Sequence, residues 1–335
     1  MLHAATLRVL PQIHSVAICE RSPLIIEGIQ KFCRNIETFA SLDQAFKEKT
    51  FNLAIIATPN ATHLDLIKTT LQHQCHLFVE KPILSSLEEA HQLNAFGIPA
   101  NQRIMVGHCL RFVPTFRLAK RILNEQVLGQ IRSFRATMYS PDVLTAAKGW
   151  RFSKESKGTG VLLDLGSHVV DMVRFLLGQP HRLHGQTRSI VSSHVEDAFE
   201  ASFEYENFSG IIESSWSHRH VRKATLEIQI DGTNGNLRVL DDLLQINLLH
   251  PHSDFPSGLT RFPITQLEEA VPFDLAGPSY TRQMQHWIQS IQTQTLNENN
   301  WNENFVNLQL LEAIRSSNGQ WIHISKNESP IHAAA

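Results

Sequence analysis

Residues 53–82 read LAIIATPNATHLDLIKTTLQHQCHLFVEKP and hold a strand, a helix and a second strand in succession. Leu53–Ala57 and His76–Val79 are short apolar runs without polar alternation, which is typical of strands buried on both faces. The residues between them predict a helix from about Ala61 to His73. Two buried strands joined by a helix form a βαβ unit, so this stretch predicts a parallel sheet covered by helices.

The same alternation continues on both sides of this unit. Upstream, Ser15–Cys19 is a short apolar run, and Ser22-Pro23 then starts a helix with a capping serine and a proline in its first turn. Downstream, the capping-box pattern at Ser85–Glu89 starts another helix, and Met105–Gly107 is expected to be the last strand. Residues 1–107 are therefore predicted to form one parallel α/β domain.

The second half of the chain has the periodicity of an antiparallel sheet with one covered face. Four segments alternate apolar and polar residues: Ile131–Tyr139, Ala198–Tyr205, Phe208–Trp216 and Ala224–Ile230. The overall prediction is an α/β fold whose second domain, residues 108–325, is α+β with a large, open, mostly antiparallel sheet.

Two late helices, about Pro278–Gln292 and Glu303–Ser317, are expected to pack back on the first domain. Between them, Asn297–Asn304 has the composition of a polar linker, and Glu328–Ala335 that of a frayed tail.

Composition excludes several classes of protein. The 335 residues are 42% hydrophobic, enough for two domains, and the net charge of −2 argues against a nucleic-acid or membrane surface that depends on net charge. Four cysteines lie far apart without a CxxC pair, which favours reduced thiols in a cytoplasmic protein over disulfides or structural zinc. The 18 histidines show no metal-ligand spacing, so no metal is expected.

A second informative stretch, GTGVLLDLGSHVVDMVRFLLG at residues 158–178, predicts a helix that is buried almost all round. Asp164, His168 and Asp171 are three or four residues apart and therefore share one helix face. Burying charge is costly unless the charge is paired, so proton transfer is a plausible reason for this polar stripe. The alternative is an Asp–His pair that only cross-links the core.

Four motifs resemble the Gfo/Idh/MocA oxidoreductases, the family of glucose–fructose oxidoreductase and inositol 2-dehydrogenase. They are TPNxxH from Thr58, EKP from Glu80, GHxxRFxP from Gly107 and DxGxH from Asp164, and the resemblance covers about residues 1–320. Family members combine a Rossmann domain with an open-sheet domain and move a hydride between NAD(P) and a sugar, polyol or nucleotide-sugar hydroxyl or carbonyl. The resemblance implies a cofactor domain over residues 1–107 and a substrate-binding and oligomerisation domain over residues 108–325.

Three residues match the catalytic set of this family: Lys81, Asp164 and His168. His168 is the better base because an imidazole, with a pKa of about 6.5, exchanges protons near neutral pH. Asp164 would orient the imidazole or bind a substrate hydroxyl. Lys81 follows an apolar strand and would polarise the reacting oxygen, unless it only lies in a solvated loop.

Cofactor contacts are expected at the ends of the first-domain strands. Glu20 ends a strand where an acidic side chain binds the adenosine ribose, which favours NAD, whereas Arg21 would suit the 2′-phosphate of NADP. Alternatively, these two residues are a solvated charge pair. The resemblance adds further residues near the dinucleotide: Thr58, Pro59, Asn60, His63, Glu80 and Lys81.

Substrate contacts are expected from cations beside an aromatic platform, at Arg111, Trp150 and Arg151. The alternative places Trp150 in the core and pairs Arg111 with a carboxylate. In the second-domain sheet, the partly apolar face of Phe199, Ala201, Phe203 and Tyr205 is expected to form a homodimer or homotetramer.

The chain departs from the family at its beginning. The family starts with a strand and a GxGxxG loop, whereas Met1–Leu7 looks like the helix that follows that loop. Without this strand, its two neighbours in the sheet lose a hydrogen-bond partner and the diphosphate loses its cradle. Either the start lies inside a longer gene, or cofactor binding is impaired. In the second case, a non-catalytic ligand sensor with the same fold becomes the alternative function.

Overall fold

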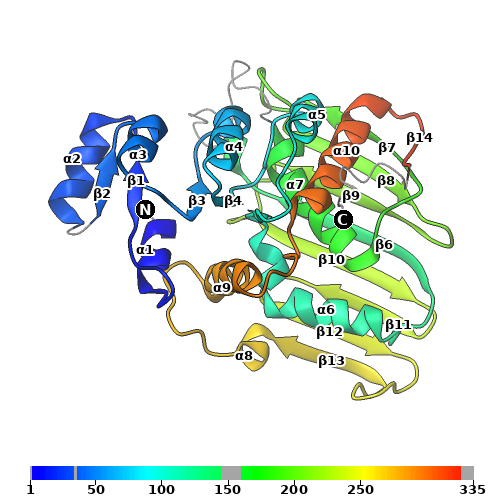
Figure 1. Ribbon diagram of the computed structural model, residues 1–335. Coiled ribbons are helices and arrows are strands. Elements are labelled where there is room, and N and C mark those ends of the chain that lie inside the picture. Colours follow the sequence, from blue (N-terminus) through cyan, green and yellow to red (C-terminus); the bar gives the residue numbers. More distant parts are fainter. Residues whose placement is uncertain (1, 34–35, 145–159, 326–335) are drawn as a thin grey trace.

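The structure, a computed structural model, describes residues 2–33, 36–144 and 160–325. The N-terminal part contains two small parallel sheets with helices around them (Figure 1). The first sheet pairs β1 (Ala17–Cys19) with β2 (Glu37–Phe39), and the second has the order β3 (Leu53–Ile56), β4 (His76–Val79), β5 (Ile104–Val106). The helices of this part are α1 (Leu2–Val9), α2 (Pro23–Phe32), α3 (Leu42–Glu48), α4 (His63–Gln72) and α5 (Leu87–Phe96).

Serine caps fix the starts of three of these helices. The hydroxyl oxygens of Ser22, Ser41 and Ser86 accept hydrogen bonds from backbone N–H groups of the first turns of α2, α3 and α5. The predicted helix after β3 begins two residues later than expected, because Asn60–Thr62 form a 3-10 turn first. The predicted strand His76–Val79 has the same bounds in the structure.

The two small sheets do not pair with each other. Among the described residues, β1 pairs only with β2, and β3 only with β4, so the expected interruption of the parallel sheet is present. Aromatic side chains join the two parts instead: Phe51 contacts Phe39 and Phe46, and Phe46 stacks on His73 with ring centroids 3.9 Å apart.

The C-terminal part is built on a nine-stranded sheet with the order β13-β12-β11-β10-β6-β9-β8-β7-β14. All neighbours are antiparallel except β6 and β9. The predicted segments become β6 (Ile131–Tyr139), β8 (Ala198–Glu204), β9 (Ser209–Ser215) and β10 (Thr225–Gly232). The strands not predicted are β7 (Arg182–Arg188), β11 (Gly235–Val239), β12 (Leu243–Leu248), β13 (Gly258–Pro263) and β14 (Ile322–His323).

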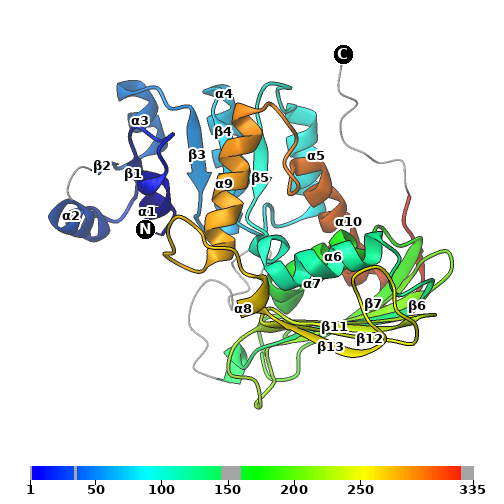
Figure 2. The same cartoon turned by 90° about the horizontal axis from the view of Figure 1, so that it is seen from below.

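Helices α6 (Pro114–Asn124), α7 (Val161–Leu177) and α10 (Trp301–Ser317) lie against one face of this sheet (Figure 2). This corrects the expectation for Phe199, Ala201, Phe203 and Tyr205, which are buried under the chain's own helices and are not free to bind another copy. Close contact explains the glycine at position 166 of α7, because a Cβ there would lie 2.9 Å from the Phe199 ring.

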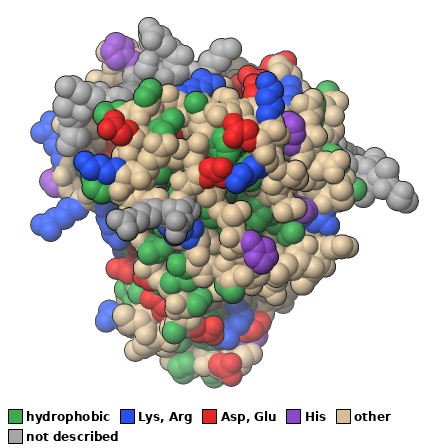
Figure 3. Space-filling model, turned by 60° about the vertical axis from the view of Figure 1, so that its left-hand side comes forward, with side chains coloured by type: hydrophobic (Ala, Val, Ile, Leu, Met, Phe, Trp, Pro, Cys, Tyr) green, Lys and Arg blue, Asp and Glu red, His purple; other side chains and the backbone are tan. Residues whose placement is uncertain are grey.

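The opposite face of the sheet is polar. Ion pairs cross neighbouring strands between Arg135 and Glu213 and between Arg238 and Glu227. On another side of the molecule, which Figure 3 turns toward the viewer, acidic and basic side chains are interspersed among apolar and uncharged ones. No described helix is both long and apolar enough to span a membrane.

The late helix α9 (Pro278–Gln292) packs on the N-terminal part, as expected. Trp287 lies against Phe78 of β4, with ring centroids 5.6 Å apart, and both side chains are fully buried. Helix α10 also reaches α5, where the Trp301 indole donates a 2.7 Å hydrogen bond to the side-chain oxygen of Asn94.

The segment Asn297–Asn304 is not a polar linker, which corrects the prediction from its composition. Asn297 and Asn299 are buried, and their side-chain amides donate to backbone carbonyls of β5 and of His108. The backbone N–H of Val106 donates to the Asn299 carbonyl at 2.9 Å, so this segment pairs with the free edge of β5. The tail predicted at residues 328–335 lies outside the described residues.

Candidate active site

An ion pair joins the two halves of the molecule. Lys81 follows β4 and Asp164 lies in the first turn of α7, 83 positions later. The Lys81 ammonium donates a 2.7 Å hydrogen bond to Oδ1 of Asp164 and a 3.2 Å bond to its carbonyl. Each side chain is 17% exposed, so the pair is mostly shielded yet still open to solvent. The predicted convergence of Lys81 with the polar face of α7 is therefore present.

His168 lies one turn after Asp164 on the same helix. Its Nδ1 atom is buried and has no hydrogen-bond partner among the described residues. Burial lowers the pKa of His168 well below its ordinary value, and the nearby Lys81 ammonium lowers it further. At neutral pH the imidazole is therefore uncharged, which is the form a general base requires.

A second ion pair, between Arg111 and Asp171, is buried beside the next turn of α7 after His168. Arg111 donates from Nε and Nη2 to the two carboxylate oxygens of Asp171, at 2.9 and 2.6 Å, and from Nη1 to the Glu298 carbonyl at 2.7 Å. The Asn307 amide adds a 2.8 Å bond to Asp171. Burial alone would raise the pKa of Asp171, but the Arg111 charge outweighs burial and holds that pKa below its usual range.

Arg111 was predicted to bind substrate, and its position does not fit that role. Its side chain is 4% exposed and its guanidinium is fully engaged by protein groups, so the alternative prediction, a carboxylate partner, describes it. Sequence reasoning gave no role to His108, whose Nδ1 lies 3.7 Å from Oδ2 of Asp171, or to Asn304, whose Oδ1 lies 2.8 Å from Nε2 of His108. Trp150 and Arg151 lie outside the described residues.

His63 ties together two loops predicted to border the cofactor. It is buried, with Nδ1 3.0 Å from the Ile83 carbonyl and Nε2 2.9 Å from the Thr58 carbonyl. These carbonyls belong to the loops after β4 and β3. Asn60 is also buried, whereas Thr58 and Pro59 are exposed on the loop after β3.

The remaining predicted cofactor residues lie at the carboxyl ends of strands. Glu20 follows β1, and its carboxylate accepts a 2.9 Å bond from the backbone N–H of Ser22, while Arg21 is exposed. Glu80 follows β4 and lies 2.7 Å from Nε2 of His3 in α1. Carboxyl ends of parallel strands are the edge where such sheets bind dinucleotides, so Glu20 and Glu80 lie on the edge that the predicted role requires.

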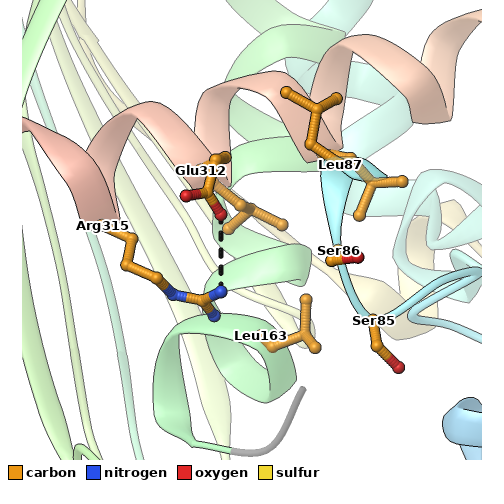
Figure 4. A pocket seen from close by; sticks show the side chains of 8 residues that line it. Ser85, Ser86, Leu87, Leu163, Glu312 and Arg315 are labelled. Atoms are coloured by element: carbon orange, nitrogen blue, oxygen red, sulfur yellow. Dashed lines mark hydrogen bonds and ion pairs between the residues drawn. The ribbon is translucent and has the colours of Figure 1, made fainter. Parts of the chain in front are cut away.

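A small pocket lies near this site, but none of the predicted site residues lines it (Figure 4). Arg315 and Glu312 of α10, 3.5 Å apart, stand on one side of it, and Leu163 of α7 stands on the other. Its complete lining is Ser85, Ser86, Leu87, Leu163, Leu308, Leu311, Glu312 and Arg315.

Family models match both halves of this chain. Residues 2–108 match the model described as "Oxidoreductase family, NAD-binding Rossmann fold", and residues 116–238 match the "GFO/IDH/MocA C-terminal domain". The chain belongs to the Gfo/Idh/MocA oxidoreductases. The two matched ranges include Lys81, after β4, and the polar face of α7.

Curated relatives of this Gfo/Idh/MocA chain include levoglucosan dehydrogenase of Pseudarthrobacter phenanthrenivorans, 35% identical over 37% of this chain and 32% of that protein. The scyllo-inositol 2-dehydrogenase (NADP(+)) of Bacillus subtilis is 25% identical over 56% of this chain and 52% of its own. The matches therefore span about a third of the first relative and about half of the second. D-apiose dehydrogenase of Paraburkholderia graminis is 25% identical over 85% of this chain and 74% of its own.

Solved structures share the whole fold. Levoglucosan dehydrogenase in complex with NADH and levoglucosan has a TM-score of 0.83, with 20% identity over 97% of this chain and 95% of that one. An oxidoreductase from Agrobacterium radiobacter in complex with NAD+, L-tartaric acid and magnesium has a TM-score of 0.81, with 19% identity over 96% of this chain and 94% of that one. At this identity the likeness establishes the fold of the Gfo/Idh/MocA chain.

The buried histidines predict how stability depends on pH. In the folded protein, burial lowers the pKa values of His63, His108 and His168, so the unfolded chain binds more protons once the pH falls below the ordinary histidine value. The contribution of these three neutral rings to the free energy of unfolding is therefore fully present above about pH 6.5. It is lost progressively as the pH falls below that value. We expect the thermal unfolding midpoint to drop between about pH 7 and pH 5, with a flatter profile for His168→Asn. An unchanged midpoint over this range would contradict the neutral, buried state of these rings.

Proposed function

We propose that this protein is an NAD(P)-dependent dehydrogenase that oxidises a CH–OH group of a sugar or polyol, or reduces the corresponding carbonyl. The observation that carries the proposal is the ion pair between Lys81 and Asp164, with the neutral imidazole of His168 one turn away. The names of the relatives, which are dehydrogenases of levoglucosan, scyllo-inositol and D-apiose, support the substrate class.

The roles follow from the chemistry of each group. His168 accepts the hydroxyl proton of the substrate, because its imidazole is uncharged at neutral pH. Lys81 stabilises the negative charge that develops on the substrate oxygen as the proton leaves. Asp164 holds the Lys81 ammonium in place through its 2.7 Å hydrogen bond. NAD(P)+, when bound, accepts the hydride from the substrate carbon.

We assign cofactor binding to residues 1–107, and substrate binding and self-association to residues 108–325. Glu20 at the end of β1 supports NAD through the adenosine ribose, and the exposed Arg21 keeps NADP as the alternative. The loop residues Thr58, Pro59, Asn60 and His63 and the side chain of Glu80 complete the proposed cofactor edge. A cytoplasmic location is proposed from the four cysteines, all of which are free thiols.

The proposed activity is tested by following NADH or NADPH formation with levoglucosan, scyllo-inositol, D-xylose and D-apiose. We expect oxidation of at least one of them, and loss of that oxidation in His168→Asn. Calorimetry with NAD+ and NADP+ separates the outcomes. Cofactor binding without oxidation of any sugar in the panel would favour a ligand-sensing protein, and no cofactor binding would reject the dehydrogenase.

We further propose that the chain forms a homodimer or homotetramer through the polar face of the nine-stranded sheet. Ile211 and Leu259 are exposed on this face, which also carries the ion pairs Arg135–Glu213 and Arg238–Glu227. Apolar side chains with charged groups around them are typical of a protein–protein interface. Light scattering after size exclusion is expected to give at least twice the 37.9 kDa chain mass, and less for Ile211→Glu. A monomer would reject this interface.

A further inference from the structure

His108 is buried just after β5 with its two ring nitrogens in different surroundings. Nε2 lies 2.8 Å from Oδ1 of Asn304. The Asn304 amide nitrogen donates to the backbone carbonyls of Asn299 and Asn300, at 3.2 and 2.9 Å, so the orientation of this amide is fixed. Oδ1 must then accept, and Nε2 of His108 must carry the hydrogen. In a neutral His108, the lone pair therefore resides on Nδ1.

Nδ1 of His108 lies close to the Asp171 carboxylate but receives no hydrogen bond from the described residues. It is 3.7 Å from Oδ2 of Asp171, and no described residue donates a hydrogen bond to it. Nδ1 of His168 is likewise buried and unpartnered. The two rings are nearly perpendicular, at 87°, with centroids 6.2 Å apart. Buried polar atoms normally have partners, so two unpartnered imidazole nitrogens in one cluster call for an explanation.

We propose that His108 takes up, through Nδ1, the proton that His168 releases from its own Nδ1 when it accepts the substrate hydroxyl proton. The inference rests on the proposed dehydrogenase function. His108 acts only through His168, and is therefore a positioning residue.

The proposed transfer balances without a further reactant. The substrate O–H bond breaks, and its proton binds Nε2 of His168. In this scheme the neutral His168 carries its hydrogen on Nδ1, and that hydrogen then leaves as a proton for Nδ1 of His108. A centroid separation of 6.2 Å is too long for a direct hydrogen bond, so the proton crosses through one water or after a small ring movement. The electron pair of the substrate C–H bond leaves as hydride to NAD(P)+, and the protonated His108 is paired with the Asp171 carboxylate.

The charges around the two rings favour one added proton and oppose a second. Asp171 favours the protonated form of His108, whereas Lys81 and Arg111 oppose it. A proton on His108 in turn opposes one on His168. The groups that face the two rings from the packed elements are Lys81 after β4, Arg111 in the 3-10 turn after β5, Asp164 and Asp171 of α7, and Asn304 of α10.

The first test measures the two rings in the full chain without substrate. Histidines labelled with ¹³C at Cε1 are titrated by NMR, and the two signals are assigned by their loss in His108→Gln and His168→Asn. Glutamine at position 108 can still donate to Asn304 but cannot accept a proton. If the rings compete for one proton, the His168 midpoint rises by about one pH unit in His108→Gln. An identical His168 midpoint in the two proteins would overturn the proposal.

The second test follows sugar oxidation with the sugar of the panel that is turned over fastest. We expect His108→Gln to lower kcat about tenfold and to move the acidic limb of the kcat–pH profile to higher pH. A merely structural role would lower kcat without moving this limb, and that result would reject the relay. If His108→Gln does not fold, His108→Asn takes its place.

His76→Gln serves as the matched control, because His76 lies at the start of β4 and also has a pKa lowered by burial. We expect it to leave the His168 midpoint and the acidic limb unchanged. The two proposals fail separately: if no sugar is oxidised, the dehydrogenase is rejected, while the NMR titration still decides whether the two rings share a proton.

Discussion

Replacing Lys81 by methionine is expected to lower kcat for sugar oxidation about 100- to 1,000-fold, with a smaller effect on KM. Methionine keeps most of the side-chain volume but removes the only ammonium that hydrogen-bonds to Asp164 among the described residues. The charge that develops on the substrate oxygen is then unopposed in a mostly shielded site. Steady-state kinetics with the best sugar of the panel measures the effect.

The matched control is Lys120→Met. Lys120 is a half-buried lysine on α6 whose ammonium lies 5.6 Å from the centre of the Phe175 ring. It belongs to none of the proposed contacts, so its loss is expected to leave kcat close to that of the unaltered chain. Turnover by Lys81→Met at the rate of this control would show that Lys81 does not stabilise the substrate oxygen.

Replacing Asp171 by alanine is expected to lower the free energy of unfolding by about 3–5 kcal/mol. The change leaves the Arg111 guanidinium buried without the carboxylate that it binds through two hydrogen bonds. Much of the cost comes from that uncompensated charge, and the loss of the attraction itself adds less. Urea denaturation followed by circular dichroism gives the difference directly.

Two comparisons identify the cause of this loss. The double variant Arg111→Met/Asp171→Leu removes both charges at once and is expected to regain most of the lost stability. Glu312→Ala breaks the exposed pair with Arg315 and is expected to change stability by less than about 1 kcal/mol. Equal losses for the single and the double variant would assign the effect to packing and not to charge.

Local patterns were sufficient to predict the N-terminal part of the fold. The strand His76–Val79 and the helices capped by Ser22 and Ser86 depend on signals within a few residues, and the structure shows them at or near the predicted positions. Strands β11–β13 were not predicted, because each is short and its local pattern is weak. What makes them strands is their hydrogen bonding to neighbouring strands of the sheet. The order of nine strands depends on non-local hydrogen bonds, which a single sequence does not reveal.

The same difference applies to the candidate site. Spacing on one helix placed Asp164 and His168 together, and the family resemblance brought Lys81 to them from 83 positions away. His108 belongs to the GHxxRFxP motif of the resemblance but was given no role, because a histidine after a buried strand looks the same whether it fills the core or accepts a proton. The Arg111 side chain could have bound substrate or a carboxylate, and only the position of Asp171 distinguishes the two.

The asparagine segment along β5 has a consequence for how the chain must be made. An unpaired edge strand is a template for aggregation with other chains, and β5 is such an edge until residues 297–300 cover it. Those residues follow β5 by more than 190 positions in the chain. During synthesis on the ribosome, most of the protein therefore emerges before this edge is covered, so the nascent chain has to be kept from its neighbours over that interval.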